Sequence, residues 1–218
     1  ISTNYGFYNY INDNINEDKN IMFIDFGDIH LNIFITRFNK NKYQILKKNN
    51  INIGGLFINL EIMEFIKNKI SIQNKIDVDY KCKMKIMKEC EKIKKTLNLK
   101  QNCYFKSECF YNELDINIEI KYEDYQQIIT PIMIKIQNFI ENFVDDNIDF
   151  DHIEIIGGSS RLNSFKELIK NITNKEIKTT MNIEETVANG LNIVSAIKLP
   201  QIITKEYIIN QKKNENIY

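Results

Sequence analysis

The sequence predicts a mixed α/β fold in which one α/β unit is interrupted by an inserted block. Three short apolar or alternating runs, typical of strands, lie at residues 22–26, 31–35 and 43–46. A strand at 152–156 ends in two glycines and leads into a stretch with the spacing of an amphipathic helix. Residues 54–129 lie between these two sets and carry helices and strands of their own, which indicates an insertion.

In chain order the sequence predicts three strands in a meander, two helices, two strands, a helix, a strand and two helices. The middle elements are expected as a helix after Gly54-Gly55, a helix at 79–97, strands at 103–110 and 114–120, and a helix at 122–144. Pro131 either bends this last helix or marks its start.

The helix faces and ends are predicted from periodicity and capping chemistry. Ser159 or Ser160 is available as the N-cap of the helix that follows residues 152–156. The last helix should start near Glu184-Glu185 and end before Pro200, with a weak strand at 207–209. The first helix is predicted to turn Leu60, Met63, Ile66 and Ile70 inward. For the second-last helix the predicted inward residues are Leu162, Phe165, Leu168 and Ile172. For the last helix they are Val187, Leu191, Val194 and Ile197.

The amino-acid composition and charge of the chain limit the classes of function that it can have. Lysine and arginine together number 29 in the 218 residues, and so do aspartate and glutamate, so no long-range field favours nucleic acid or membranes. No apolar run is long enough to span a bilayer. The four cysteines form no C-x-x-C pair and lie far in sequence from both histidines, which favours free thiols over zinc. The first residues have no Met and no signal-peptide pattern, which suggests a cut inside a larger protein.

Four segments contain residues of the kinds that bind polar or anionic ligands. Asp25 and Gly27 end a strand, where backbone N–H groups can approach an anion if no Cβ intervenes. Gly54-Gly55 opens a helix, and Gly157-Gly158 leads into a helix N-terminus, which suits an anion. The fourth segment places four polar residues at i, i+3, i+4 and i+7 on one helix face: Glu91, Lys94, Lys95 and Asn98. Taken singly, a Gly-Gly turn is common and a lysine-rich helix is usually a solvated face.

In their order and spacing these segments resemble the second lobe of the nucleotide-binding domain of the heat shock protein 70 family, and more specifically its large heat shock protein 110 branch. Residues 182–190 resemble the family's hinge helix, and residues 108–115 resemble a strand pair of that branch. The resemblance covers nearly the whole chain. It implies one lobe of an actin-like (ribonuclease H-like) ATPase domain with an inserted α+β outer subdomain.

The resemblance also divides the chain and assigns a ligand. It implies an inner subdomain at 1–53 and 130–206, an outer subdomain at 54–129 and an exit strand or linker at 207–218. The expected ligand is ATP or ADP, bound together with a first lobe that the sequence does not contain. The nucleotide-binding residues that the resemblance implies are Asp25, Gly27, Glu91, Lys94, Lys95, Asn98, Gly157, Gly158, Ser159, Arg161 and Glu184. Asp25 is also the candidate contact to a Mg²⁺ shell or an attacking water, and no metal ligand set or further catalytic residue is assigned.

The chain departs from the family at the phosphate loop. Where the family has two further glycines and a threonine, the sequence has Asp28, Ile29 and His30. Ile29 puts a β-branched side chain where backbone must approach phosphate, and Asp28 adds negative charge that costs on the order of 1 kcal/mol even at a water-like dielectric. Turnover is therefore expected to be weak or absent. The proline of the hinge helix is replaced by Ile183, a change that should matter little.

The function that the resemblance implies is that of a nucleotide-regulated co-chaperone. Its partners would be a heat shock protein 70 chaperone, on which it promotes nucleotide exchange, and unfolded client proteins, which it holds. Neither nucleic acid nor membrane is expected as a partner. A cytoplasmic location is expected, with the endoplasmic reticulum left open. The alternatives are an ATP-hydrolysing chaperone, a nucleotide-free pseudo-ATPase scaffold and, more distantly, a sugar kinase with the same actin-like fold.

Overall fold

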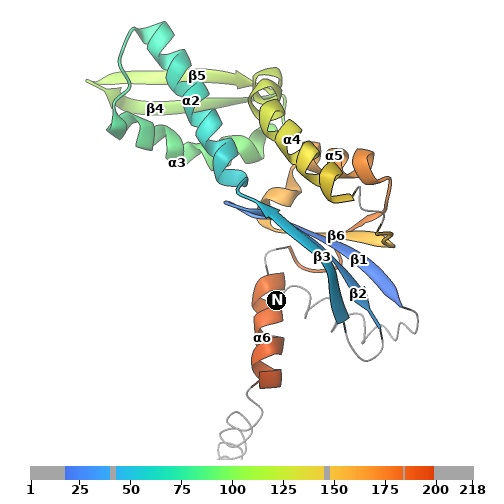
Figure 1. The fold of residues 1–218 in the computed structure, drawn as a ribbon. Helices are drawn as coiled ribbons and strands as arrows, with labels where there is room; N and C mark the ends of the chain where they lie inside the picture. Colours follow the sequence, from blue (N-terminus) through green and yellow to red (C-terminus); the bar gives the residue numbers. More distant parts are fainter. Residues whose placement is uncertain (1–17, 40–42, 145–147, 184, 199–218) are drawn as a thin grey trace, which may run out of the picture.

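A five-stranded sheet organises the larger part of the molecule, which we call the sheet unit (Figure 1). The computed structural model describes residues 18–39, 43–144, 148–183 and 185–198. The strand order is β3-β2-β1-β6-β7, in which neighbours from β3 to β1 are antiparallel and those from β1 to β7 are parallel. The strands are β1 (Lys19–Phe26), β2 (Leu31–Phe38), β3 (Tyr43–Ile51), β6 (His152–Ile156) and β7 (Ile177–Lys178). The predicted mixed α/β class is confirmed.

The central strand β1 is buried on both faces, which explains its nearly unbroken apolar sequence. Met22 and Ile24 belong to the large core that also contains the buried residues of the helices, whereas Phe23 belongs to a smaller cluster on the opposite face. In that second cluster the Phe23 ring stacks on Phe34 with 5.0 Å between centroids. The alternation of side chains along a strand therefore supplies two separate cores from one segment.

Two helices cover the first face of the sheet, α4 (Tyr122–Val144) and α5 (Asn163–Thr173), as Figure 1 shows. Phe165 of α5 is fully buried, and its ring lies 4.5 Å from that of Phe26. Ile136 and Ile140 of α4 are also fully buried in the same core. These contacts bring the start of α5 close to the end of β1.

The remaining elements form a smaller α+β part, which we call the outer unit. It consists of the helices α2 (Gly55–Asn74) and α3 (Tyr80–Leu97) and the antiparallel hairpin of β4 (Asn102–Tyr111) and β5 (Leu114–Lys121). Alternate residues of β5 are buried, namely Ile116, Ile118 and Ile120. Asp79 caps α3, because its side chain accepts a hydrogen bond from the Cys82 N–H at 2.8 Å. The large core runs without interruption through both units.

The predicted order of elements is confirmed, with the short strand β7 added. Helix α4 has the predicted bounds, and Pro131 lies in its interior rather than at its start. The predicted inward face of α2 is wrong in part, since Leu60 is 39% exposed and the buried isoleucines include Ile58 and Ile62. The face is rotated because α2 packs against both α3 and α4, and each of these helices buries part of its surface.

The helix after Gly157-Gly158 does not begin at once, contrary to the prediction. A 3₁₀ turn, η1 (Gly158–Arg161), comes first, and α5 begins only at Asn163. Ser159 and Ser160 therefore lie inside η1 and neither caps α5. The Ser160 hydroxyl instead donates to the Gly157 carbonyl at 2.7 Å. Within α5, Phe165 and Ile169 are the buried residues, and Leu168 and Ile172 are only partly buried.

The last helix, α6 (Thr186–Lys198), starts close to the predicted position. Val187 and Leu191 are 40% and 47% exposed, so its predicted inward face is wrong at these two positions. The predictions for Glu184, for Pro200, for the strand at 207–209 and for the side chains of Val194 and Ile197 lie outside the described residues. All four cysteines are free, and within the described residues no helix is long and apolar enough to cross a bilayer.

Candidate functional site

The candidate site lies where the carboxyl ends of the parallel strands β1 and β6 meet the outer unit. Asp25 pairs with Ile156 in the sheet register, so the loops after the two strands start side by side. Gly157 has φ +85°, which favours glycine. A Cβ there would lie 2.4 Å from the Phe26 carbonyl oxygen and 2.7 Å from Asp25 Oδ1. The absence of a side chain at Gly157 thus lets the Asp25 carboxylate approach the backbone of the second loop.

The Asp25 carboxyl is mostly buried, and this burial raises its pKa above the ordinary value. A hydrogen bond with the Asn32 side chain opposes the rise in pKa without cancelling it. Asn32 is also the residue paired with Asp25 in the β1–β2 register. The structure thus gives Asp25 a partner on the neighbouring strand, which the sequence pattern did not indicate.

The turn that follows β1 is docked on the first turn of α2 through backbone atoms. The Gly55 N–H donates to the Gly27 carbonyl at 3.0 Å, and the Leu56 N–H donates to the Asp28 carbonyl at 2.8 Å. A Cβ on Gly54 would lie 2.2 Å from the same Asp28 oxygen. Gly54 is therefore required for this close approach, and the helix uses two of its free N–H groups on the turn.

Three polar side chains from three segments converge on Gly55. A Cβ on this residue would lie 2.4 Å from Ser159 Oγ, 2.9 Å from Lys94 Nζ and 3.3 Å from Asp28 Oδ1. Ser159 and Lys94 are buried, whereas Asp28 is exposed. The convergence joins η1, α3 and the turn after β1 at one point, and it places the unexpected Asp28 beside two of the predicted site residues.

Lys94 is buried, although the helix spacing places it on the same face of α3 as the exposed Lys95. Its ammonium lies 2.6 Å from Glu91 Oε2 and donates to the Gly55 carbonyl at 3.3 Å. Asn59 of α2 donates to the same Glu91 oxygen at 3.0 Å, and Glu91 Oε1 lies 3.3 Å from Lys95 Nζ. The Lys95 side chain is 74% exposed. Lys94 thus points toward α2, and Lys95 points toward solvent.

Burial of Glu91 acts to raise its pKa, but the hydrogen bonds from Lys94 and Asn59 and the charge of Lys94 outweigh it. The pKa of Glu91 consequently lies below its ordinary value, and the carboxylate is held ionised at neutral pH. An ionised carboxylate flanked by ammonium groups can accept hydrogen bonds from ligand hydroxyls at the partly exposed edge of α3.

Asn98, the C-cap of α3, is bonded to the loop before α5. Its side-chain nitrogen donates to the Arg161 carbonyl at 3.3 Å, and its Oδ1 accepts from the Asn163 N–H at 2.8 Å. The Asn163 side chain donates in return to the Asn98 carbonyl at 3.0 Å. These three bonds tie the outer unit to the sheet unit and use one of the free N–H groups at the start of α5.

The described site residues gather around one edge, but they differ in accessibility. Gly158 faces open space, since a Cβ there would have no atom of the described residues within 4 Å, and Arg161 is exposed. Glu184 lies outside the described residues, so its place relative to the edge stays a prediction. Sequence reasoning missed Asn59 and Asn163, because asparagine is so frequent in this chain that single asparagines carry little information. The position of Asn59 on the buried face of α2 was the one signal available.

The geometry defines a mixed α/β domain in which glycine-lined turns and a polar helix face meet at the carboxyl ends of two parallel strands. A profile of the family described as "Hsp70 protein" matches residues 1–211, and the chain therefore belongs to the heat shock protein 70 family. The predicted family is confirmed.

The relatives found by sequence include members of the large branch. The chain is 28% identical over 202 residues to "Heat shock protein 110" of Caenorhabditis elegans, covering 88% of this chain and 26% of that protein. It is 27% identical over 199 residues to the "97 kDa heat shock protein" of Strongylocentrotus purpuratus and 26% identical over 199 residues to "Heat shock 70 kDa protein 4L" of Homo sapiens. These two alignments cover 88% of this chain and 22% and 24% of the relatives. The chain thus spans about a quarter of the length of these curated relatives.

Proposed function

We propose that this chain is the second lobe of the nucleotide-binding domain of a heat shock protein 110-type co-chaperone. Residues 1–53 and 130–206 would be the inner subdomain, and residues 54–129 would be the outer subdomain. The observation that carries the proposal is the meeting of Gly157-Gly158, η1 and the end of α3 at one edge of the sheet. In this family those segments are the ones expected to seat an adenine nucleotide.

The residues at this edge fit an adenosine. Gly158 leaves its surroundings open, which lets a flat ring lie against the backbone. Lys95 and Arg161 are exposed cations that can stack on a base, and the ionised Glu91 can accept hydrogen bonds from ribose hydroxyls. The buried Lys94 would act mainly by holding Glu91 in place.

The residues near the phosphate loop fit a chain of phosphates poorly. Asp28 brings a carboxylate oxygen beside Gly55, and Ile29 is 50% exposed in the turn where the family has glycine. When bound, Mg²⁺ would screen phosphate charge, and Asp25 is the residue we propose to contact its shell. We accordingly propose that ATP or ADP binds together with a first lobe and is hydrolysed weakly or not at all. Binding alone can still set the closure of two lobes.

In the cell, such a lobe would act within a cytoplasmic co-chaperone, or one of the endoplasmic reticulum. This co-chaperone would promote nucleotide exchange on a heat shock protein 70 partner and would hold unfolded clients. The competing functions are an ATP-hydrolysing chaperone and a nucleotide-free scaffold. Asp28 argues against the first of these, and the open edge at Gly158 argues against the second. Steady-state ATP hydrolysis by the full-length parent separates the proposal from the hydrolysing chaperone.

The experiment that tests the proposal is an NMR titration of the 218-residue chain with ADP up to millimolar concentration. Amide shifts should move at Lys94, Lys95, Asn98 and residues 157–161 and remain fixed at the hairpin tip. Lys95→Ala should weaken binding about fivefold, as expected for loss of one cationic contact of roughly 1 kcal/mol. Lys92→Ala, one position outside the predicted set on the same helix, is the matched control. If ADP moves no amide at this edge, the nucleotide-free scaffold becomes the better description.

A further inference from the structure

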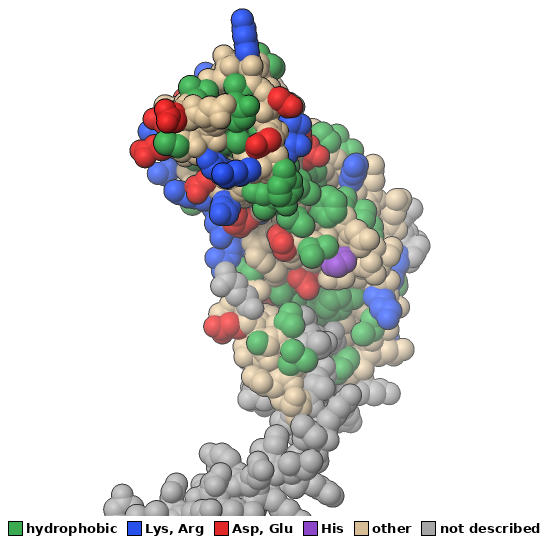
Figure 2. Space-filling model, turned by 90° about the vertical axis from the view of Figure 1, so that its left-hand side faces the viewer, with side chains coloured by type: hydrophobic (Ala, Val, Ile, Leu, Met, Phe, Trp, Pro, Cys, Tyr) green, Lys and Arg blue, Asp and Glu red, His purple; other side chains and the backbone are tan. Residues whose placement is uncertain are grey.

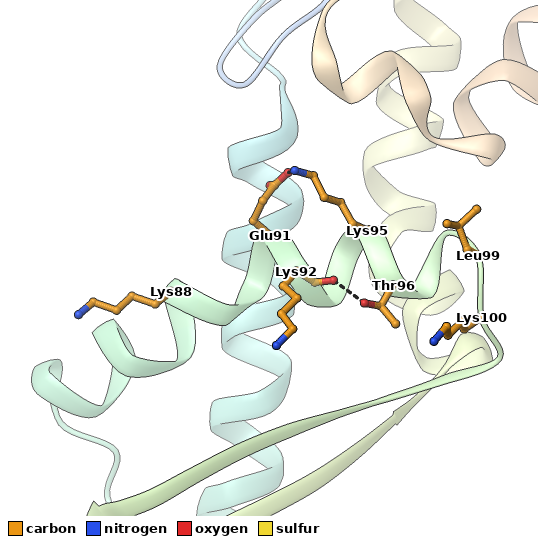
Figure 3. Close-up of a pocket in the computed structure, with 7 residues that line it drawn as sticks. All are labelled: Lys88, Glu91, Lys92, Lys95, Thr96, Leu99 and Lys100. Carbon is orange, nitrogen blue, oxygen red and sulfur yellow. Dashed lines mark hydrogen bonds and ion pairs between the residues drawn. The ribbon is translucent and has the colours of Figure 1, made fainter.

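A lysine-lined groove follows the outer face of α3 and includes Glu91 and Lys95 of the predicted nucleotide residues (Figure 3). Its volume is about 520 Å³. The side chains that line it come from three successive turns of α3 and the residues just after them: Lys88, Glu91, Lys92, Lys95, Thr96, Leu99 and Lys100. Figure 2 shows lysine and arginine side chains interspersed with aspartate and glutamate in this upper part of the molecule, over the outer unit. The chain as a whole is neutral, so the groove is a local excess of positive charge.

The charges of this lysine groove are not balanced within the fold. Four lysines face a single glutamate, and Glu91 is already shared between Lys94 and Lys95. Within the described part of the chain Lys88 and Lys100 form no ion pair, whereas Lys92 forms an exposed ion pair with Glu89 at 3.7 Å. Lys88 and Lys92 stand at i and i+4, a spacing at which like charges destabilise a helix by about 0.2–0.5 kcal/mol. An anionic ligand would remove this repulsion.

The lysine groove also offers apolar surface. Leu99 is 80% exposed at its end, and the rest of its wall is formed largely by the hydrocarbon stems of lysines. An exposed leucine among ammonium groups favours a ligand that combines carboxylates with aliphatic side chains. None of the described residues that line the groove is aromatic, so they offer no stacking platform of the kind that single-stranded nucleic acid uses.

The length of the lysine groove decides between a small anion and a chain. From Lys88 to Leu97, the last residue of α3, the backbone advances by roughly 14 Å at the rise of an α-helix, and Lys100 lies in the turn beyond it. A single phosphate reaches at most two of the four ammonium groups, whereas an extended peptide of about six residues spans the distance. We propose that this groove binds an acidic peptide segment of another protein, in which aspartates or glutamates flank a leucine-like side chain. This site goes beyond the proposed nucleotide function, with which it shares Glu91 and Lys95.

The test uses a fluorescent peptide of about twelve residues, in which two leucines are set among glutamates and aspartates, and follows its anisotropy as the 218-residue chain is added. The triple variant Lys88→Ser, Lys92→Ser, Lys100→Ser avoids every residue of the predicted nucleotide site. It should bind the peptide at least about tenfold more weakly, as expected for three exposed charge contacts. The matched control, Lys135→Ser, Lys166→Ser, Lys170→Ser, removes the same charge from α4 and α5 and should bind normally.

Two further arms test the chemistry. Leu99→Ser should weaken binding of the leucine-containing peptide about threefold to tenfold, as expected for one partly buried aliphatic contact. It should leave binding of an all-glutamate peptide unaffected. A peptide with glutamine and asparagine in place of its acids should not bind. The proposal is overturned if both triple variants lose binding equally, if the neutral peptide binds as well as the acidic one, or if single-stranded RNA displaces the peptide at lower concentration. ADP titration of the triple variant should be unchanged, so that failure of this groove is distinguishable from failure of the nucleotide site.

Discussion

The Asn98 and Asn163 side chains and backbones form a reciprocal pair across the junction of the two units. Asn98 Oδ1 accepts from the Asn163 N–H at 2.8 Å, and Asn163 Nδ2 donates to the Asn98 carbonyl at 3.0 Å. The residues are separated by 65 positions in sequence, so the pair closes a long loop. A side-chain amide engaged in this way also has less freedom to turn toward a nucleotide.

Removing this amide pair should destabilise the fold measurably. Replacing Asn98 by alanine leaves the first N–H of α5 without its acceptor, and we expect a loss of about 1–2 kcal/mol in the free energy of unfolding. Urea denaturation followed by circular dichroism measures this loss. Asn171→Ala, an exposed asparagine on the same α5, is the control and should change the midpoint little. Equal effects of the two substitutions would show that the pair contributes nothing.

The two glycines after β6 should respond differently to alanine. Gly157→Ala forces a Cβ to within 2.4 Å of the Phe26 carbonyl at φ +85°, so we expect a loss of at least about 2 kcal/mol. Gly158→Ala places its Cβ in open space and should alter stability by less than about 1 kcal/mol. Thermal unfolding of the two variants side by side provides the comparison. A similar midpoint for both would contradict the close approach between the loops.

The charge of Asp28 should weaken the binding of a ligand that carries phosphates and should leave the binding of adenosine unchanged. Asp28→Asn keeps the shape of the side chain and removes a charge worth about 1 kcal/mol at a water-like dielectric, so ADP should bind about fivefold more tightly. Adenosine, which has no phosphate, should bind unchanged. Isothermal titration of both ligands against both proteins measures the difference. Equal gains for adenosine and ADP would place Asp28 away from the phosphates.

Glu154 should make stability depend on pH in a predictable direction. Its side chain is buried, and burial raises its pKa although Thr180 donates two hydrogen bonds to it at 2.6 and 3.2 Å. The folded state therefore holds the proton more tightly than the unfolded chain. Stability that this group contributes is present below the ordinary pKa of 4.5 and is lost as pH rises through the higher folded value.

Glu154→Gln cannot ionise and should be free of this loss. The free energy of unfolding of the variant, relative to the natural chain, should therefore grow as pH rises from about 4.5 to 7. Urea midpoints at several pH values give the difference curve, in which most other titrating groups cancel. His152 lies 3.7 Å from Glu154, and burial lowers its pKa, so its own titration adds little charge in the upper part of this range. A difference that stays constant with pH would contradict the buried position of Glu154.

The apolar periodicity predicted helices and strands well where a single repeat runs through the whole segment. Helix α4 follows a regular apolar repeat, and the sequence predicts both of its ends. The buried face of α2 does not follow from the sequence in the same way. Leu60 and Ile58 are both apolar, and only the positions of α3 and α4 decide which of them is buried. Strand β7 has two residues, too few to produce a pattern.

The site was predicted as a set of residues but not as an arrangement. Helical spacing puts Lys94 and Lys95 on the same side of α3, and it cannot show that α2 covers one of them. The turn Asp28-Ile29-His30 was recognised as a departure from the family, yet its position beside Gly55 depends on contacts between segments 27 residues apart. Asn59 and Asn163 were missed because their partners lie in other elements.

The chain crosses between the sheet unit and the outer unit at only two places in the described residues. It enters through Gly54 after β3 and returns through α4, which is continuous from β5 down to the sheet. A movement of the outer unit relative to the sheet unit would therefore bend the chain at these two crossings, and it would also have to separate side chains of the shared core. The Asn98–Asn163 hydrogen bonds join the two units at a third place, so such a movement would have to break them as well.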